Sequence, residues 1–161
     1  MNRNILACLL TMSIASHQAF AQGERSTIAD NLPSLGLTTL QKALEETGVL
    51  ATLRGKGPYT LFAPSNSAFL MLGKKRNIQF FADKKVLRVA LLNHIVLGKY
   101  TTEDLGKLPN KKVLKTIGQG SLVVFNQGTM LINGSKPYLA NKPASNGIIQ
   151  IMDRAMLQKV K

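Results

Sequence analysis

The sequence predicts an α+β fold in a single domain, and three features lead to this prediction. Its 161 residues are about the length of one domain, and 45% of them are apolar, which is enough for a packed core. Apolar residues recur at helical spacing in the first part of the chain, around one early strand-like segment. Further on, the apolar period becomes two, as in antiparallel strands separated by turns.

Residues 1–21 have the anatomy of a secretory signal peptide. Arg3 precedes the apolar run Ile5–Ile14, which is too short to span a bilayer, and Ala19-Phe20-Ala21 has the small-x-small pattern of a cleavage site. We therefore expect cleavage after Ala21 and a secreted or periplasmic protein without a transmembrane segment. Lipoprotein processing at Cys8 is the alternative, although most of the apolar run follows that cysteine.

Residues 22–34 are expected to form a lead-in to a domain that spans 35–161, with the polar stretch 22–31 loosely held. A helix is predicted to begin near Thr38, because Thr38 and Gln41 have the spacing of a capping box. Gly48 is predicted to end this helix, and Gly55 to Pro58 to form a turn.

The early strand is predicted at Tyr59–Ala63, where β-forming residues precede a proline that cannot donate to a ladder. Ser65 or Asn66 can cap a short helix that continues to Leu72. Asp83 is the expected N-cap of a helix that runs to about Asn93. The remaining elements are a helical turn at 101–105 and short strands at 121–125, 129–133, 136–139 and 147–153.

Three segments of the chain resemble the signature segments of fasciclin domains. Tyr59–Phe69 (YTLFAPSNSAF) is similar to the first, T-x-F-A-P-[ST]-x-x-A-F, and Asn146–Asp153 (NGIIQIMD) to the second, N-G-x-I-H-x-[IM]-D. Leu91–Gly98 resembles the Tyr-His segment between them. The segments occur in family order, and the resemblance covers roughly Leu37–Leu157.

The resemblance implies a wedge of two β-sheets with flanking helices, and a role as an extracellular adhesion or matrix module that is not an enzyme. The positions that match the family's structural motif are Phe62, Pro64, Asn66, Phe69, His94, Asn146, Gly147 and Asp153. For Asn66, a structural role is favoured over ligand contact, because a short amide between a strand and a helix most often closes the turn.

The chain departs from the family pattern at three places. Asn93 replaces the tyrosine before the histidine, and Gln150 replaces the histidine of the second segment. Asn141-Lys142 stands where animal adhesion members have the Asp-Ile pair used for integrin binding. Animal-type integrin recognition is therefore not expected here.

The sequence offers little for catalysis or for a cofactor. After signal removal, His94 is the only histidine and no cysteine remains, so neither a disulfide nor a Cys/His metal site is expected. No G-x-S-x-G elbow or dinucleotide fingerprint is present, and the adjacent acids Glu45-Glu46 and Glu103-Asp104 diverge on a helix. We expect His94 to be a hydrogen-bonded core residue, and a hydrolase is the least favoured function class.

The net charge of +13 leaves two interpretations open. Either the cations form a solvated surface, or they attract an anionic partner such as lipopolysaccharide, an acidic polysaccharide or an anionic lipid. No nucleic-acid-binding motif is present. The candidate binding residues are Lys74, Lys75, Arg76, Lys84 and Lys85, and a second basic group comprises Lys107, Lys111, Lys112 and Lys115.

Together these observations predict a secreted, non-enzymatic fasciclin-like domain that binds a protein or glycan of a cell surface or matrix. It would act at the bacterial cell envelope or outside the cell. A basic polyanion-binding domain of the cell surface is the alternative. The sequence does not identify the ligand or the oligomeric state.

Overall fold

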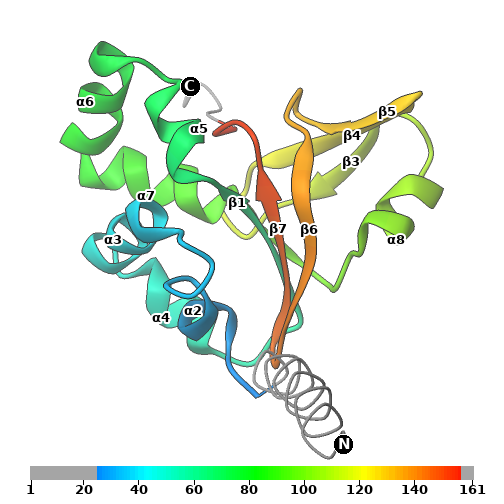
Figure 1. Ribbon diagram of the computed structural model, residues 1–161, viewed down its shortest axis with the longest axis horizontal. Helices are drawn as coiled ribbons and strands as arrows, with labels where there is room; N and C mark the ends of the chain where they lie inside the picture. Colours follow the sequence, from blue (N-terminus) through cyan, green and yellow to red (C-terminus); the bar gives the residue numbers. More distant parts are fainter. Residues whose placement is uncertain (1–24, 157–161) are drawn as a thin grey trace, which may run out of the picture.

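The computed structural model describes residues 25–156, so the expected signal peptide, its cleavage site and Cys8 lie outside the described residues. The chain forms a wedge of two β-sheets with most of its helices on one side (Figure 1). The helices are α2 (Ile28–Asn31), α3 (Thr38–Glu46), α4 (Val49–Arg54), α5 (Asn66–Leu70), α6 (Lys74–Ala82), α7 (Lys84–Leu92) and α8 (Thr102–Lys107). The strands are β1 (Tyr59–Pro64), β2 (Ile95–Leu97), β3 (Lys112–Lys115), β4 (Ser121–Gln127), β5 (Thr129–Ile132), β6 (Pro137–Ala144) and β7 (Gly147–Met152).

The α+β prediction, with a two-sheet wedge and flanking helices, is confirmed. The four-stranded sheet has the order β2-β1-β7-β6, and the three-stranded sheet has the order β3-β4-β5. β1 and β7 pair in parallel, whereas every other strand pair is antiparallel. The two sheets join where Val96 of β2 bridges Thr116, just after β3.

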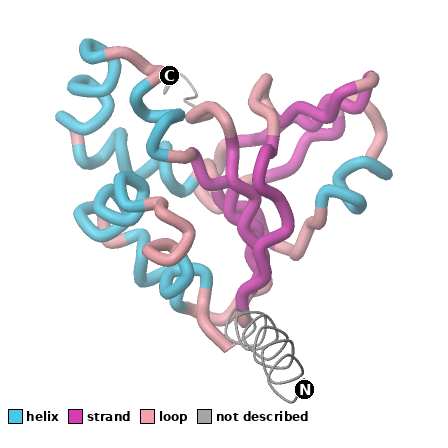
Figure 2. Tube along the Cα trace, viewed as in Figure 1, coloured by secondary structure: helices cyan, strands magenta, loops and turns pink. Residues whose placement is uncertain are grey.

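The central strands β1 and β7 of the four-stranded sheet are buried on both faces, and each face packs on a different cluster. Leu61 and Ala63 of β1 point toward the helices, whereas Phe62 points toward the three-stranded sheet. On the helix side, Leu40 and Leu44 of α3 are fully buried. Figure 2 shows the strands lying between the main group of helices and the isolated α8.

The lead-in differs from the expected loose segment. Thr27 caps α2 with its hydroxyl, and Ile28 and Leu32 are fully buried in the helix-side cluster. The sequence pattern does not indicate this helix, because four residues are too few to display a helical period. The described part of the lead-in is therefore integral to the core.

Two further helices were not expected, and one predicted cap is wrong. Gly48 ends α3 as predicted, but its left-handed backbone (φ 71°) immediately starts α4. Residues 74–82, expected to connect two helices, form α6. The N-cap of α3 is Leu37, which has no capping side chain, so the predicted Thr38–Gln41 box does not form. Asp83, by contrast, caps α7 as predicted.

Candidate functional site

Asn66 supplies the cap that α3 lacks. Its side-chain oxygen accepts a hydrogen bond from the backbone N–H of Thr39 at 3.1 Å, near the start of α3. Its amide nitrogen donates to the carbonyl of Gly36 and to the hydroxyl of Thr38, both at 3.0 Å. The cap of α5 comes instead from Ser65, whose hydroxyl accepts from Ala68 N–H. Asn66 thus fixes α5 to α3 rather than closing its own turn.

Asn146 has the same kind of role at the other end of the molecule. Its side-chain oxygen accepts from Ile28 N–H, in the first turn of α2, at 2.9 Å. Its amide nitrogen donates to the carbonyls of Leu53 and Gly55, where α4 ends. One asparagine in the β6–β7 turn therefore holds two helices.

The other motif positions lie in the packed scaffold. Phe62 and Phe69 are buried, and Pro64 ends β1. A Cβ atom on Gly147 would collide with the Tyr59 carbonyl of the adjacent strand, so only glycine fits there. Asp153 accepts a 2.7 Å hydrogen bond from Lys136 N–H before β6.

His94 is enclosed, with 1% of its surface exposed. Its Nδ1 lies 2.7 Å from the Ala90 carbonyl, and its Nε2 accepts from Met156 N–H at 3.2 Å. The two contacts fix a neutral ring with the proton on Nδ1. Burial lowers the pKa of His94 from 6.5, opposed in part by the hydrogen bond to Ala90. Both ring nitrogens are thus engaged in holding the chain.

The three departures from the family pattern form hydrogen-bonded contacts of their own. Asn93 accepts bonds from the Thr116 hydroxyl and from Gly120 N–H, which fixes the β3–β4 turn to the end of α7. Gln150 is fully buried and bonds to Asn141 twice, at 2.9 Å each. The contact between Gln150 and Asn141 was not predictable from the sequence, because it depends on the irregular register of β6 between Leu139 and Lys142.

The five candidate cations lie on two helices rather than in one compact cluster. Lys74, Lys75 and Arg76 form the first turn of α6, and Lys84 and Lys85 begin α7. The two subsets lie at opposite ends of α6, a helix about 13 Å long. All five are exposed, and none forms an ion pair with a described residue. In the second basic group, Lys107 pairs with Glu103 at 2.7 Å.

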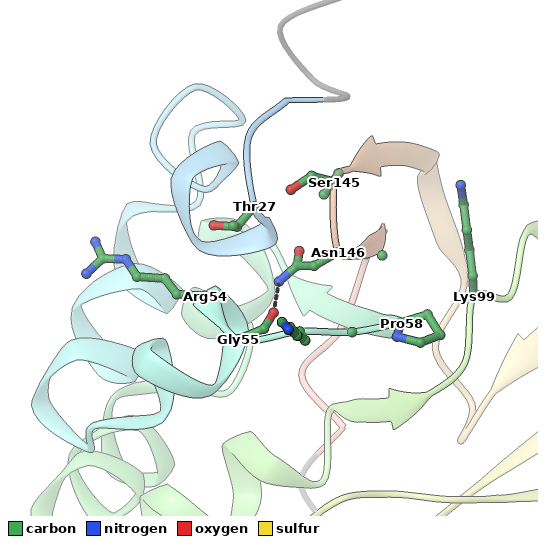
Figure 3. A pocket seen from close by; sticks show the side chains of 11 residues that line it. Thr27, Arg54, Gly55, Pro58, Lys99, Ser145 and Asn146 are labelled. Atoms are coloured by element: carbon green, nitrogen blue, oxygen red, sulfur yellow. Dashed lines mark hydrogen bonds between the residues drawn. The ribbon is translucent and has the colours of Figure 1, made fainter.

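A hollow that sequence reasoning missed lies beside Asn146, between the end of α4 and the β6–β7 turn (Figure 3). It has a volume of about 540 Å³, and its lining includes Arg54, Lys56 and Lys99 but no carboxylate. Figure 3 places Arg54 and Lys99 on opposite sides of Asn146, with the Arg54 side chain directed away. Arg54 lies 3.8 Å from the Asp30 carboxylate. The Arg54 and Lys99 side chains therefore do not converge on one ligand atom.

Within residues 25–156, no group of three or more potential metal-binding side chains gathers in one place. Over the same residues, no helix is both long and apolar enough to cross a bilayer.

Comparison with known proteins agrees with this architecture. A model of the fasciclin domain family matches residues 35–158. The pig (Sus scrofa) transforming growth factor-beta-induced protein ig-h3 is 31% identical over 139 residues, covering 82% of this chain and 20% of that protein. Protein sll1483 of Synechocystis is 29% identical over 122 residues, covering 74% of this chain and 66% of that protein.

A solved FAS1 domain pair from the insect cell adhesion molecule fasciclin I shares the fold, with a TM-score of 0.69 at 19% identity. The match covers 83% of this chain and 51% of that one. A Plasmodium falciparum protein named heme ligase is 25% identical over 120 residues, covering 63% of this chain and 58% of that protein. The chain thus spans between a fifth and two thirds of these curated relatives.

Proposed function

The chain belongs to the fasciclin domain family, and from this membership we propose that it is a non-enzymatic adhesion or matrix-binding domain. In this proposal it is secreted or periplasmic, and it acts at the bacterial cell envelope or outside the cell. Its partner is a protein or glycan of a cell surface or matrix. The match to a domain pair from a cell adhesion molecule supports the role, and the signal-like residues 1–21 support the location.

The observation that carries the proposal is how the polar side chains of the family segments are used. Asn66 and Asn146 hold helix ends, and His94 engages both ring nitrogens inside the protein. These side chains maintain the scaffold, so a partner would meet the outer surface rather than a reactive centre.

An array of cell-surface glycans, matrix proteins and lipids, probed with the exported protein, tests this proposal. Selective binding at physiological salt is the expected result. Because one relative is named heme ligase, the same preparation is incubated with haem and with hydrolase substrates. Turnover of any of them would contradict the non-enzymatic proposal.

Polyanion binding is the second candidate, and the unpaired cations of α6 and α7 favour it. Five exposed cations without ion pairs in the described structure attract an acidic polysaccharide or lipid at low salt, and screening weakens that attraction as salt increases. Changing Lys74, Lys75, Arg76, Lys84 and Lys85 to Gln should flatten the salt dependence of binding to an acidic polysaccharide.

A charge-matched control removes five exposed lysines elsewhere and should bind like the wild-type protein at every salt concentration. The control changes Lys107, Lys111, Lys112, Lys115 and Lys136 to Gln. Equal losses in both variants would mean that only net charge matters, and the α6–α7 cations would then be an ordinary solvated surface.

A further inference from the structure

The most exposed large apolar side chains of the described protein lie next to three of its unpaired cations. Leu70 is 76% exposed, and Met71 and Ile78 are each 67% exposed. Lys74, Lys75 and Arg76 lie between them in the sequence. We call residues 70–78 the α5–α6 tip. Figure 1 places α6 at the end of the molecule opposite the start of the described chain.

The orientation of α6 explains why Ile78 remains uncovered. Phe80 is buried and lies against Phe69 and Phe81, with ring centroids 6.3 and 5.4 Å apart. At 100° per residue, Ile78 lies about 160° from Phe80, between Lys74 and Lys75 on the outer face of the helix. The aromatic contacts therefore fix α6 so that one apolar and two cationic side chains face solvent together.

The composition of the tip distinguishes between possible occupants. A second copy of the chain would bring like cations together, which is unfavourable. A soluble acidic polysaccharide would pair with the cations but leave Leu70, Met71 and Ile78 in water. A bilayer with acidic headgroups matches both features, because apolar side chains enter the headgroup region while lysine and arginine bind its anions.

We propose that the α5–α6 tip docks on an anionic phospholipid bilayer. Leu70, Met71 and Ile78 insert at the headgroup level, and Lys74 and Lys75, which flank Ile78 on α6, bind the acidic headgroups. The inference deepens the polyanion-binding candidate above and rests on it for the charge, but it adds an apolar component that a soluble polyanion cannot use.

Vesicle binding by the exported protein tests the apolar component. The vesicles contain phosphatidylcholine with about one third phosphatidylglycerol, at about 0.15 M salt. The variant Leu70→Gln/Met71→Gln/Ile78→Gln should bind at least tenfold more weakly. A matched control, Leu97→Thr/Val113→Thr/Tyr138→Thr, changes side chains that are 63%, 53% and 59% exposed elsewhere, and should bind like wild type.

Insertion can be followed directly because the chain contains no tryptophan. A single reporter in Ile78→Trp should shift to shorter emission wavelengths with the anionic vesicles but not with a soluble acidic polysaccharide. The same reporter in Tyr138→Trp should not shift with either.

Two other outcomes would contradict the lipid-docking proposal. If the apolar variant binds vesicles as tightly as wild type while Lys74→Gln/Lys75→Gln binds weakly, the contact is purely electrostatic. The lipid-docking proposal then fails and the polyanion candidate survives. If neither variant weakens binding, or if wild type does not bind these vesicles, the tip is not a lipid-docking surface.

Discussion

Two asparagine side chains cap helices that lie far from them in the sequence. Asn66 bonds to residues 27 to 30 positions away, and Asn146 bonds to residues more than 90 positions away. A local cap stabilises only its own helix, whereas a distant cap also fixes the position of one element against another. This explains why the motif asparagines are needed by the fold itself.

Asn66→Ala should lower the free energy of unfolding by about 1–2 kcal/mol, because it leaves Thr39 N–H and the Gly36 carbonyl without their partner. Urea unfolding measures the change. The neighbouring exposed residue provides a control, and Ser67→Ala should change stability little. An Asn66→Ala protein with unchanged stability but lost partner binding would show that this amide contacts the ligand instead.

Stability should decrease as the pH falls below 6.5, because His94 is buried as a neutral ring. In that range the unfolded chain takes up a proton that the folded ring resists, at a cost of up to about 1.4 kcal/mol per pH unit. Above this range the His94 ring is neutral in both the folded and the unfolded chain, so it adds no pH dependence to the stability. Asp30 and Asp104 do not interfere, since their hydrogen bonds to Thr27 and Thr101 lower each pKa from 3.8.

Urea unfolding between about pH 7.5 and 5.5 measures this slope in the wild-type protein and in His94→Gln. The variant should be less stable overall but should lose less stability with acid. Equal slopes in the two proteins would mean that another group causes the pH dependence.

At the scale of elements, the sequence predicts helix ends that depend on neighbouring residues. It does not predict caps or strand pairings that depend on residues far away in the chain. The helix that begins after Asp83 was predicted because its cap is two and three residues from its N–H partners. The cap of α3 was misplaced because its real partner, Asn66, is 27 residues away. The parallel pairing of β1 with β7 could not be predicted from the sequence either, since the paired residues Tyr59 and Gly147 are separated by most of the domain's sequence.

The candidate binding surface was predictable only in part. The sequence identified the cations of residues 74–76 and 84–85, because charge is visible without a structure. It did not show that Ile78 faces solvent beside Lys74 and Lys75, because that orientation follows from the packing of Phe80 on Phe69. The hollow beside Asn146 was also invisible, since it is assembled from four separate segments.

The described part of the lead-in, residues 25–34, belongs to the core, and a mutation at Ile28 tests this. Ile28→Ala should cost about 2–5 kcal/mol, because Ile28 is fully buried among the helices. Ser34→Ala, at an exposed position of the same segment, should cost much less. Urea denaturation of the two variants measures both effects. A negligible effect of Ile28→Ala would restore the original expectation of a loose lead-in.

For the molecule as a whole, the central sheet couples the two hydrophobic clusters. β1 contributes Leu61 to the helix-side cluster and Phe62 to the cluster between the sheets. β7 likewise contributes Ile151 to the first and Met152 to the second. Because the same two strands support both clusters, neither cluster can open without disturbing the other.

The molecule should therefore unfold in one cooperative step, and core mutations on either side should lower the stability of both. Leu44 and Leu122 are fully buried in different clusters, so Leu44→Ala and Leu122→Ala should each cost about 2–5 kcal/mol. Native-state hydrogen exchange measures the opening free energies of slow amides in α3 and β4 separately. If the clusters are coupled, Leu122→Ala lowers the protection of α3 as much as that of β4, and Leu44→Ala does the converse. Protection lost only on the mutated side would show that the helices and the three-stranded sheet unfold independently, and that the shared strands do not transmit the destabilisation.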